Sequence, residues 1–455
     1  MSLFSSLSLP SLKLLLGLGL CSLTAWSTAA TDTTKKTVET TLNNGLKVIV
    51  LEDHRAPMVM SHIWYKVGST DESGHTLGIS HVLEHMMFKG THKVPNDEFT
   101  RLSRVYGGRI NAATFTNYTN YYQLYPKAYF PLALELEADR MSNLLLRQQD
   151  FEPEVRVVME ERRQRTDDNP RAVAFEKFKW ISYPTSHYRQ PIIGHMKSLQ
   201  SIRLSDVQDW YKKWYTPNNA ILVIVGDVQA DEAILQVQKY FGDIPSRALP
   251  IRNDVEEFTH VGYRHVEMEA AVQVPNLYMT WNVKSIATAE PPNDAYTLTI
   301  IRSLLDSGIN SRLQKNLVHD QKILSSVSVS YDPYNRGDSL FGISALPNSG
   351  ISLEQAKVAI EKEIEAIKNE PVKQAEIDRI ATRFVSNMVY SQDDISNQAK
   401  LIGNLEVNGL SYRLLDELPE HFRKIRPSDV QRVAQYYFVK NNLSTLYLSP
   451  VKKVS

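Results

Sequence analysis

The segment Gly78–Thr91, with the sequence GISHVLEHMMFKGT, decides how the rest of this chain is interpreted. On an α-helix, at about 100° per residue, His85 lies roughly 40° from His81, and Glu84 lies roughly 60° to the other side. Two imidazoles and a carboxylate therefore project from one helix face, which suits two zinc ligands beside a general base. The order His-x-x-Glu-His is the reverse of the commoner zinc-binding order His-Glu-x-x-His. The alternative is a polar helix face whose imidazoles are merely solvated.

Length and composition set the broad class. A chain of 455 residues is too long for one ordinary hydrophobic core, so two or more domains are expected. Apolar residues make up 42% and charged residues 22%, as in a soluble globular protein. The formal net charge is zero, so charge gives no reason to expect binding to nucleic acid or to an anionic membrane.

The first thirty residues have the pattern of an export signal. Lys13 precedes a short apolar run, Leu14–Leu23, and mostly small residues follow as far as Ala29 and Ala30. The run is too short to span a membrane, so residues 1–30 are predicted to be a signal peptide that is cleaved after Ala29 or Ala30. A disordered or anchored N-terminus is the alternative.

Cysteine usage restricts the chemistry. Cys21 is the only cysteine, and it lies within the predicted signal peptide. The mature chain would then form no disulfide, no thiolate metal site and no cysteine nucleophile, so any zinc must be held by nitrogen and oxygen. An exported chain without cysteine fits a bacterial periplasm, with secretion beyond the cell as the alternative.

The two ends of the mature chain repeat one another. The sequence Ser-Asp-Val-Gln occurs at Ser205–Gln208 and again at Ser428–Gln431, and the pair Asn218–Asn219 recurs at Asn441–Asn442. Both matches have the same offset of 223 residues. Two halves built alike, each with strands and several helices, indicate duplicated α+β domains.

The apolar patterns place the main elements of both halves. In the first half we expect strands at 38–42, 46–51, 58–67 and 220–225, further strands within 109–125, and helices at the motif, within 127–165 and at 205–215. Strands at 276–283, 325–331 and 443–448 and a helix at 295–305 occupy the matching places in the second half. The fold class is therefore α+β, with two homologous α/β-sandwich domains.

The predicted domains are the signal peptide at 1–30, a catalytic domain at 31–248 and an inactive homologous domain at 249–455. The joint lies in Pro245–Asp254, where Pro, Arg and Asn cluster. Opposite His81, Glu84 and His85, the second half offers Arg302, Leu305 and Asp306. Only the first half is expected to bind metal in this way.

A catalytic zinc site needs a third protein ligand, and the acidic segment Phe151–Arg162 is the obvious source. Glu154 and Glu161 are seven residues apart, so on a helix they lie within about 20° of each other, whereas Glu160 points roughly 100° away from Glu161. Two stacked carboxylates suit one ligand and one outer partner. The alternative is that these charged side chains are simply solvated.

The chain resembles the family of pitrilysin, insulin-degrading enzyme and the mitochondrial processing peptidases. Besides the motif itself, the family-like pieces are Gly107–Thr114, Tyr121–Tyr122, Pro191–Gly194 and Gly226–Asp227. The resemblance runs from about Val38 to the C-terminus. It implies a fold that forms half of a clamshell.

Residue by residue, the resemblance implies that His81, His85 and Glu161 hold one zinc ion per chain. It also implies that Glu84 is the general base and that Glu154 orients the ligands. Asn111 and Ala112 match the family's edge strand, where an extended peptide adds alongside by backbone hydrogen bonds, so broad specificity is expected. An ordinary strand is the alternative for that segment.

One departure from the family pattern concerns the second half. Family enzymes complete the site with an Arg and a Tyr after a Ser-Arg-Leu, which is present here as Ser311–Leu313, but Val318 and Ser325 stand at their positions. We therefore expect a heterodimer in which a paralogous subunit supplies Arg and Tyr. A homodimer that uses other residues, or recruitment of Tyr331 or Tyr334, are the alternatives.

The predicted function is that of an exported zinc metalloendopeptidase acting on peptides or unfolded polypeptides. Two other classes compete with it. One is a peptidase-like chain kept for assembly, as in respiratory core subunits that lose metal ligands, and the other is a zinc-dependent protein that captures peptides without cutting them. This chain keeps all four key residues, His81, Glu84, His85 and Glu161, which favours the peptidase.

Overall fold

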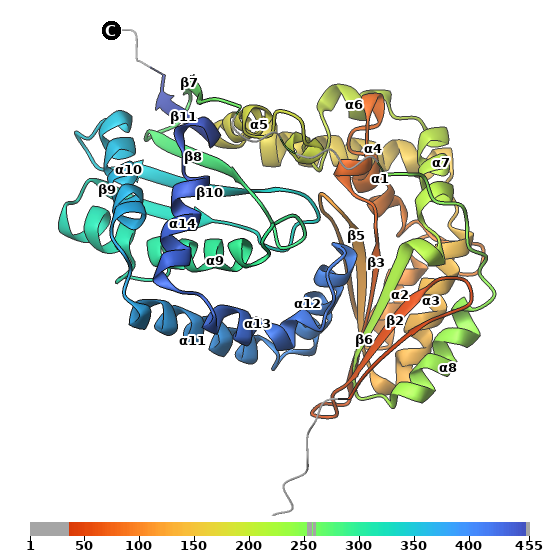
Figure 1. Ribbon diagram of the computed structural model, residues 1–455. Helices are drawn as coiled ribbons and strands as arrows, with labels where there is room; N and C mark the ends of the chain where they lie inside the picture. Colours follow the sequence, from red (N-terminus) through yellow and green to blue (C-terminus); the bar gives the residue numbers. More distant parts are fainter. Residues whose placement is uncertain (1–35, 253–256, 258–260, 452–455) are drawn as a thin grey trace, which may run out of the picture. The chain divides into compact units, whose positions relative to one another are not determined.

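The structure, a computed structural model, describes residues 36–252, 257 and 261–451 (Figure 1). The predicted signal peptide, including Cys21, lies outside the described residues. Among the residues that are described, no helix is both long enough and apolar enough to cross a membrane. The described chain forms two β-sheets with helices packed on them, so the predicted fold class is confirmed.

The first sheet has six strands in the order β1-β2-β6-β3-β5-β4. Strand β2 pairs in parallel with β6, and every other pairing is antiparallel. Strand β4 therefore lies at an edge. The bounds are β1 Thr37–Thr41, β2 Lys47–Glu52, β3 Met58–Tyr65, β4 Arg109–Thr114, β5 Thr119–Pro126 and β6 Ala220–Gly226.

The second sheet repeats this plan with five strands in the order β7-β11-β8-β10-β9. Strand β7 pairs in parallel with β11 and the remaining pairings are antiparallel, so β7 is the counterpart of β2 and β9 is the counterpart of β4. The bounds are β7 Arg264–Ala270, β8 Asn276–Val283, β9 Leu324–Ser330, β10 Ser339–Pro347 and β11 Leu443–Pro450.

The helices follow the same duplicated order. The first half contains α1 Ile79–Met86, α2 Glu98–Val105, α3 Phe130–Asn143, α4 Gln148–Arg162, α5 Pro170–Ser182, α6 Met196–Ser201, α7 Leu204–Trp214 and α8 Ala230–Phe241. The second half contains α9 Asn293–Leu305, α10 Leu353–Asn369, α11 Gln374–Ser391, α12 Ile395–Val407, α13 Leu414–Arg423 and α14 Pro427–Tyr437. Helix α1 is the first α-helix after β3, and α9 is likewise the first after β8.

The repeated tetrapeptide and asparagine pair have the same structural role in both halves. Asp206 and Asp429 each accept a hydrogen bond from the backbone N–H three residues earlier, at 2.8 and 2.9 Å, where α7 and α14 begin. Asn219 and Asn442 each donate to the carbonyl five residues earlier, at 2.9 and 3.3 Å. The repeat thus marks a helix start and the turn into the next strand.

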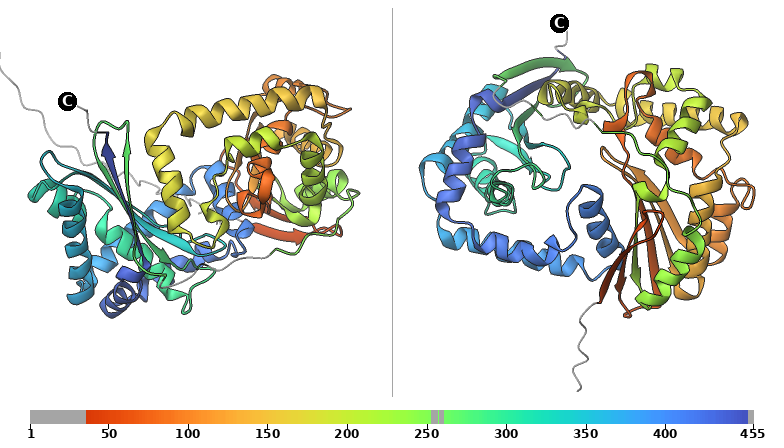
Figure 2. Two further views of the ribbon diagram at one scale, coloured as in Figure 1. Left: turned by 90° about the horizontal axis from the view of Figure 1, so that it is seen from above. Right: turned by 45° about the vertical axis from the view of Figure 1, so that its right-hand side comes forward.

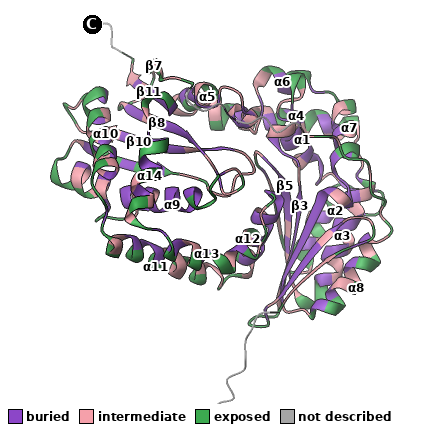
Figure 3. Ribbon diagram, in the orientation of Figure 1, coloured by how far each residue is buried: buried purple, intermediate pink, exposed green. Residues whose placement is uncertain are grey.

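Both faces of the first sheet are covered, because alternate side chains of a strand point to opposite faces. In β6, Leu222 and Ile224 join the core formed with α1, α3, α7 and α8, whereas Ile221, Val223 and Val225 pack against α12. Strands β3 and β6 are consequently buried almost throughout (Figure 3). Continuous apolar strands of this kind are typical of sheets covered on both sides.

The halves exchange a helix. Helix α12 of the second half packs on β3 and β6 of the first sheet, and Figure 2 shows it, in blue, beside those strands. Helix α5 of the first half packs on β7 and β11 of the second sheet, where Ala174 and Phe178 meet Leu446 and Leu448. Each sheet therefore buries one face against its own helices and the other against a helix of the opposite half.

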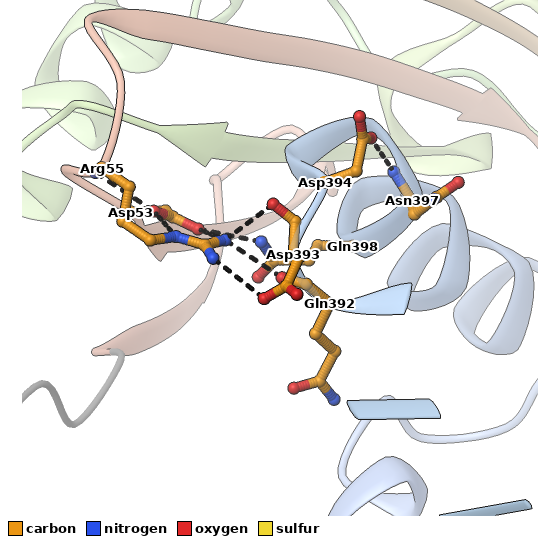
Figure 4. Close-up of polar contacts among 7 residues, drawn as sticks. All are labelled: Asp53, Arg55, Gln392, Asp393, Asp394, Asn397 and Gln398. Carbon is orange, nitrogen blue, oxygen red and sulfur yellow. Dashed lines mark hydrogen bonds and ion pairs between the residues drawn. The ribbon is translucent and has the colours of Figure 1, made fainter. Parts of the chain in front are cut away.

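Polar contacts fix the start of α12 against the loop after β2 (Figure 4). Asp53 is buried and accepts hydrogen bonds from Arg55, at 2.6 Å, and from Gln398 of α12, at 2.9 Å. Arg55 also donates to the carbonyls of Gln392 and Asp393, at 3.1 and 3.0 Å, just beyond the end of α11. One guanidinium thus links the first half to the turn between α11 and α12.

Candidate metal centre

The first turn of α1 is anchored by a buried carboxylate. Glu72 accepts hydrogen bonds from the backbone N–H groups of Gly78, at 2.6 Å, and Ser80, at 2.9 Å. A carboxylate at a helix N-terminus satisfies free N–H groups and interacts favourably with the helix dipole. Burial nevertheless raises the pKa of Glu72 to about 8. The short helix that carries the motif is therefore held in place at its first residues.

Helices α1 and α4 bring three potential ligands together. Nε2 of His81 lies 3.7 Å from Oε2 of Glu161, and Nε2 of His85 lies 3.6 Å from the same oxygen. The ligand atoms of these three residues all lie within 4.8 Å of one another. Zinc bound tetrahedrally at about 2.1 Å from each ligand would separate neighbouring ligand atoms by roughly 3.4 Å. The three side chains that were predicted to bind zinc therefore lie at a spacing that fits such an ion.

The protonation of the first imidazole suits metal binding. His81 is 8% exposed, and its burial lowers the pKa of the ring to about 3. An imidazole must be neutral to bind a metal ion. His81 therefore needs no deprotonation at neutral pH before it can act as a ligand.

The second imidazole is oriented by a carboxylate behind it. Nδ1 of His85 lies 3.2 Å from Oε2 of Glu154, and Nζ of Lys89 lies 2.5 Å from the other oxygen of that carboxylate. The hydrogen bond to His85 lowers the pKa of Glu154 although partial burial opposes it, and Lys89 lowers it further. An Nδ1–H donated to Glu154 leaves Nε2 of His85 free to face Glu161. This is the outer position expected for Glu154.

The glutamate between the histidines faces the edge strand. The Thr114 hydroxyl, at the end of β4, donates a hydrogen bond of 2.5 Å to Oε2 of Glu84. Burial raises the pKa of Glu84, while the Thr114 hydrogen bond opposes the shift. A carboxylate with a raised pKa is a better proton acceptor at neutral pH. Glu84 is therefore suited to general-base chemistry beside the three potential ligands.

Glu160, the acidic neighbour of Glu161 on α4, points elsewhere, as the helix spacing predicts. The side chain of Glu160 is 54% exposed and pairs with Arg163 at 2.9 Å. Glu161 instead keeps Oε2 toward the imidazoles, and its Oε1 lies 2.7 Å from Arg165. The alternative interpretation of solvated acidic side chains therefore describes Glu160 and not Glu161.

The predicted substrate residues lie on the edge strand. Asn111 and Ala112 are in β4, whose pairing partner on one side is β5. The backbone N–H of Ala112 is bound at 2.9 Å by the side-chain oxygen of Asn111. Because α1 contacts β4, this edge runs beside the motif helix.

The positions of the missing Arg and Tyr have other roles in the second half. Val318 packs against the second core, and the Ser325 hydroxyl donates to the carbonyl of Leu346 at 3.1 Å. The alternative tyrosines also belong to that core: Tyr331 donates its hydroxyl to the carbonyl of Lys284 at 2.7 Å, and Tyr334 is partly buried. Val318 cannot donate a hydrogen bond, and the hydroxyls of Ser325 and Tyr331 donate to backbone carbonyls of the second half.

Sequence reasoning missed three residues that support the site: Glu72, Lys89 and Thr114. Glu72 and Thr114 act across the fold, on the start of α1 and on Glu84, so no helical spacing could select them. Lys89 lies four residues after His85. If the motif helix is continued to Lys89, the two side chains lie on the same face, and this spacing could have identified Lys89.

Comparison with known proteins identifies the family. The family model described as insulinase, peptidase family M16, matches residues 47–195, and the model described as peptidase M16 inactive domain matches residues 201–384. The zinc protease PqqE of Helicobacter pylori is 30% identical over 419 residues, which cover 90% of this chain and 92% of that protein.

Solved structures agree. The crystal structure of a protease from Helicobacter pylori matches with a TM-score of 0.85 and 28% identity, covering 91% of this chain and all of the other. The periplasmic protease PqqL from Escherichia coli matches with a TM-score of 0.78 and 16% identity. That match covers 91% of this chain but 47% of the PqqL chain, and at this identity it concerns the fold alone.

A fold of two sheets with a His-x-x-Glu-His helix beside an acidic helix is that of a metallopeptidase. The chain belongs to the M16 peptidase family, that of insulinase and pitrilysin. The predicted family and the prediction of a zinc metallopeptidase are confirmed at this level. The role of each residue, the domain boundaries and the partner remain predictions.

Proposed function

We propose that His81, His85 and Glu161 hold one zinc ion and that Glu84 is the general base of an endopeptidase. The observation that carries this proposal is the convergence of three ligand atoms within 4.8 Å of one another, with the Glu84 carboxylate on the same helix. A zinc ion bound there supplies a Lewis acid that polarises a peptide carbonyl and lowers the pKa of water toward about 7. The catalytic unit is the first half, predicted as residues 31–248.

The protein's own groups manage the protons. Glu84 takes a proton from the attacking water at its carboxylate and returns it to the leaving amine. Thr114 holds that carboxylate in place through its hydroxyl. Glu154 orients His85 through Nδ1, and Lys89 balances the charge of Glu154. Each chemical role is thus supported by a second side chain behind it.

The substrate is proposed to be an extended peptide segment that adds to the edge of β4 at Asn111 and Ala112. Backbone pairing of this kind recognises the main chain more than the side chains, so the enzyme accepts varied sequences. The Ala112 N–H donates to the Asn111 side-chain oxygen at 2.9 Å, so it is a donor that an incoming peptide carbonyl would have to take over. A peptide is therefore expected to displace the Asn111 amide when it binds.

We also propose that a paralogous subunit completes the site with Arg and Tyr. The positions that carry this pair in the family hold Val318 and Ser325, and the hydroxyl of Tyr331 is already engaged with a backbone carbonyl. Loss of an oxyanion donor costs on the order of 100-fold or more in rate. The match to about half of the PqqL chain is consistent with a second unit of similar size.

Metal content and hydrolysis test the central proposal. The purified chain is expected to hold one zinc ion, and His81→Ala and Glu161→Gln are expected to lose it. Hydrolysis of a quenched peptide library, with the partner present, should follow zinc content. Stoichiometric zinc without any cleavage would instead favour a protein that captures peptides, and unchanged zinc in Glu161→Gln would overturn the ligand assignment.

Co-purification from the native host, followed by mass spectrometry, tests the partner. A second M16 chain that carries the Arg and Tyr is the expected result, and adding it should raise kcat of the purified chain by about 100-fold or more. Full activity of the chain alone would contradict the heterodimer.

The proposed location is the periplasm, after cleavage at Ala29 or Ala30. Sequencing the N-terminus of the mature chain from the host tests it, because a protein that still begins at Met1 contradicts export by a cleaved signal.

A further inference from the structure

Arg162, next to the proposed ligand Glu161, is a buried cation with an unusual set of partners. It is 5% exposed. Its guanidinium donates to both oxygens of Glu176 on α5, at 2.6 and 2.9 Å, to Asp167 at 3.0 Å, and to the backbone carbonyl of Gly194 at 2.9 Å. Glu176 and Asp167 already balance the charge of Arg162. The bond to the Gly194 carbonyl is therefore not needed for charge balance, and it holds the Gly194 backbone in place.

Gly194 lies directly against the start of the motif helix. A β-carbon on Gly194 would lie 2.2 Å from the carbonyl oxygen of Leu77, and one on Gly78 would lie 2.7 Å from the carbonyl oxygen of Ile193. Both glycines have positive φ angles, +77° and +96°. The two backbones are therefore in direct contact, and a shift of Gly194 would displace Gly78, the residue from which α1 begins.

These contacts form a short path between the two sides of the metal centre. Glu161 is followed on α4 by Arg162, Arg162 holds Gly194, and Gly194 abuts Gly78 at the beginning of the helix that carries His81 and His85. We propose that Arg162 is a positioning residue that sets the separation between the Glu161 carboxylate and the two imidazoles. The inference rests on the proposed zinc site, and it adds a residue that never touches the metal.

The shape of the arginine side chain explains why this residue type is needed. A planar guanidinium carries five N–H donors in a fixed fork, so it can hold Glu176 with two bonds and still reach a carbonyl in another direction. A lysine ammonium keeps the charge but lacks that fork. Arg162→Lys therefore preserves the ion pair with Glu176 while loosening the hold on Gly194.

Zinc affinity of the full chain tests the proposal, measured by competition with a chelator on metal-free protein. Arg162→Lys is expected to weaken zinc binding about 10- to 100-fold, the usual effect of losing an outer-shell contact. The absorption bands of the cobalt-substituted protein should change in the same variant, because they report the geometry of the ligands. A role limited to fold stability would lower the melting temperature but leave both measurements unchanged.

Arg432→Lys is the matched control. Arg432 on α14 binds both oxygens of the buried Asp294 at the start of α9, at 2.7 and 3.3 Å, so it is a two-bond arginine–carboxylate pair in the second half, with a more exposed arginine than Arg162. This control should keep the zinc affinity and cobalt spectrum of the wild type.

Wild-type affinity in a folded Arg162→Lys protein would overturn the proposal while leaving the zinc site intact. Absence of zinc binding in the wild type would overturn the proposed function and this inference together. If Arg162→Lys does not fold, Glu176→Gln replaces it, since it weakens the hold on the guanidinium while keeping the shape of its partner, and the same two outcomes decide.

Discussion

Helices α1 and α9 occupy equivalent places in the two halves, where they face the edge strands β4 and β9. Their side chains contact these strands in different ways. In the first half, Glu84 accepts a hydrogen bond from the Thr114 hydroxyl, and the two histidines turn toward α4. In the second half, Arg302 donates to the carbonyl of Val329 at 3.2 Å, and Asp306 accepts from the N–H of the same residue at 3.0 Å.

The difference explains why one half is suited to chemistry and the other is not. The residues aligned with His81 and His85 are Arg302 and Asp306, and both are engaged with the backbone of the edge strand. That strand is thereby covered at Val329. In the first half the corresponding strand meets α1 at Thr114, whose hydroxyl donates to Glu84 and whose backbone also bonds that carboxylate.

The largest effect is expected for Glu84→Gln. The amide keeps the shape of the side chain but cannot accept a proton, so kcat should fall by about 10²- to 10⁴-fold while bound zinc is retained. Steady-state kinetics of the complete enzyme, with metal analysis, measure both. The same carboxylate-to-amide change in the second half, Asp306→Asn, is at the position aligned with His85; it should leave kcat within about twofold and lower only the stability, by about 1–3 kcal/mol. Normal turnover by Glu84→Gln would remove the functional distinction between the halves.

A smaller effect is expected for Thr114→Val. Losing a hydrogen bond to a charged group costs about 1.5–3 kcal/mol, so kcat should fall by about 10- to 100-fold as Glu84 becomes less well oriented. Thr114→Ser keeps the hydroxyl and is expected to restore most of the rate. If valine and serine behave alike, the hydroxyl has no part in positioning the base.

The smallest effect concerns the two exchanged helices. His62 shares the face of β3 with Met60 and Trp64, which α12 covers, and burial lowers the pKa of His62 to about 3. Below a pH of about 6.5 the His62 ring binds a proton in the unfolded chain, whereas in the folded chain it stays neutral. The free energy of unfolding therefore falls as the pH falls. From pH 7 to pH 5 this loss is about 2 kcal/mol.

The opposite contact, between α5 and the second sheet, includes hydrogen bonds between neutral groups: Ser182 is bonded to Thr280 at 3.0 Å and to Asn282 at 2.7 Å. Urea unfolding at pH 7 and pH 5 measures how much the free energy of unfolding changes between the two pH values. His62→Phe should reduce the loss of stability on acidification, whereas Thr280→Val should not change it. An equal loss in wild type and His62→Phe contradicts the assignment to this ring.

Helix geometry predicts part of the metal centre, and the family resemblance implied that the acidic helix supplies the third ligand. The positions of His81, Glu84 and His85 on one face, and of Glu154 and Glu161 on another, depend only on the residues per turn. Thr114, Glu72 and Arg162 could not be found in this way, since their partners come from other elements of the folded chain.

The fold was predictable to a similar extent. Strand β6 was predicted at nearly its observed bounds, whereas β10, Ser339–Pro347, was not predicted although it lies inside the second sheet. Strand β7 was missed because it lies at an edge, where alternate charged residues leave Val266 and Met268 as the main apolar signals. The exchange of α5 and α12 was also missed, because an apolar helix face does not reveal which sheet will cover it.

That exchange has a consequence for handling the protein in pieces. If the chain were divided in the segment after α8, each fragment would expose an apolar sheet face and an orphaned apolar helix, Ala174 and Phe178 on one fragment and Ala399 and Ile402 on the other. Each fragment alone is therefore expected to aggregate through these exposed apolar surfaces. When the two fragments are produced in the same cell, they should bind each other and re-form the fold. Split-reporter designs require this property.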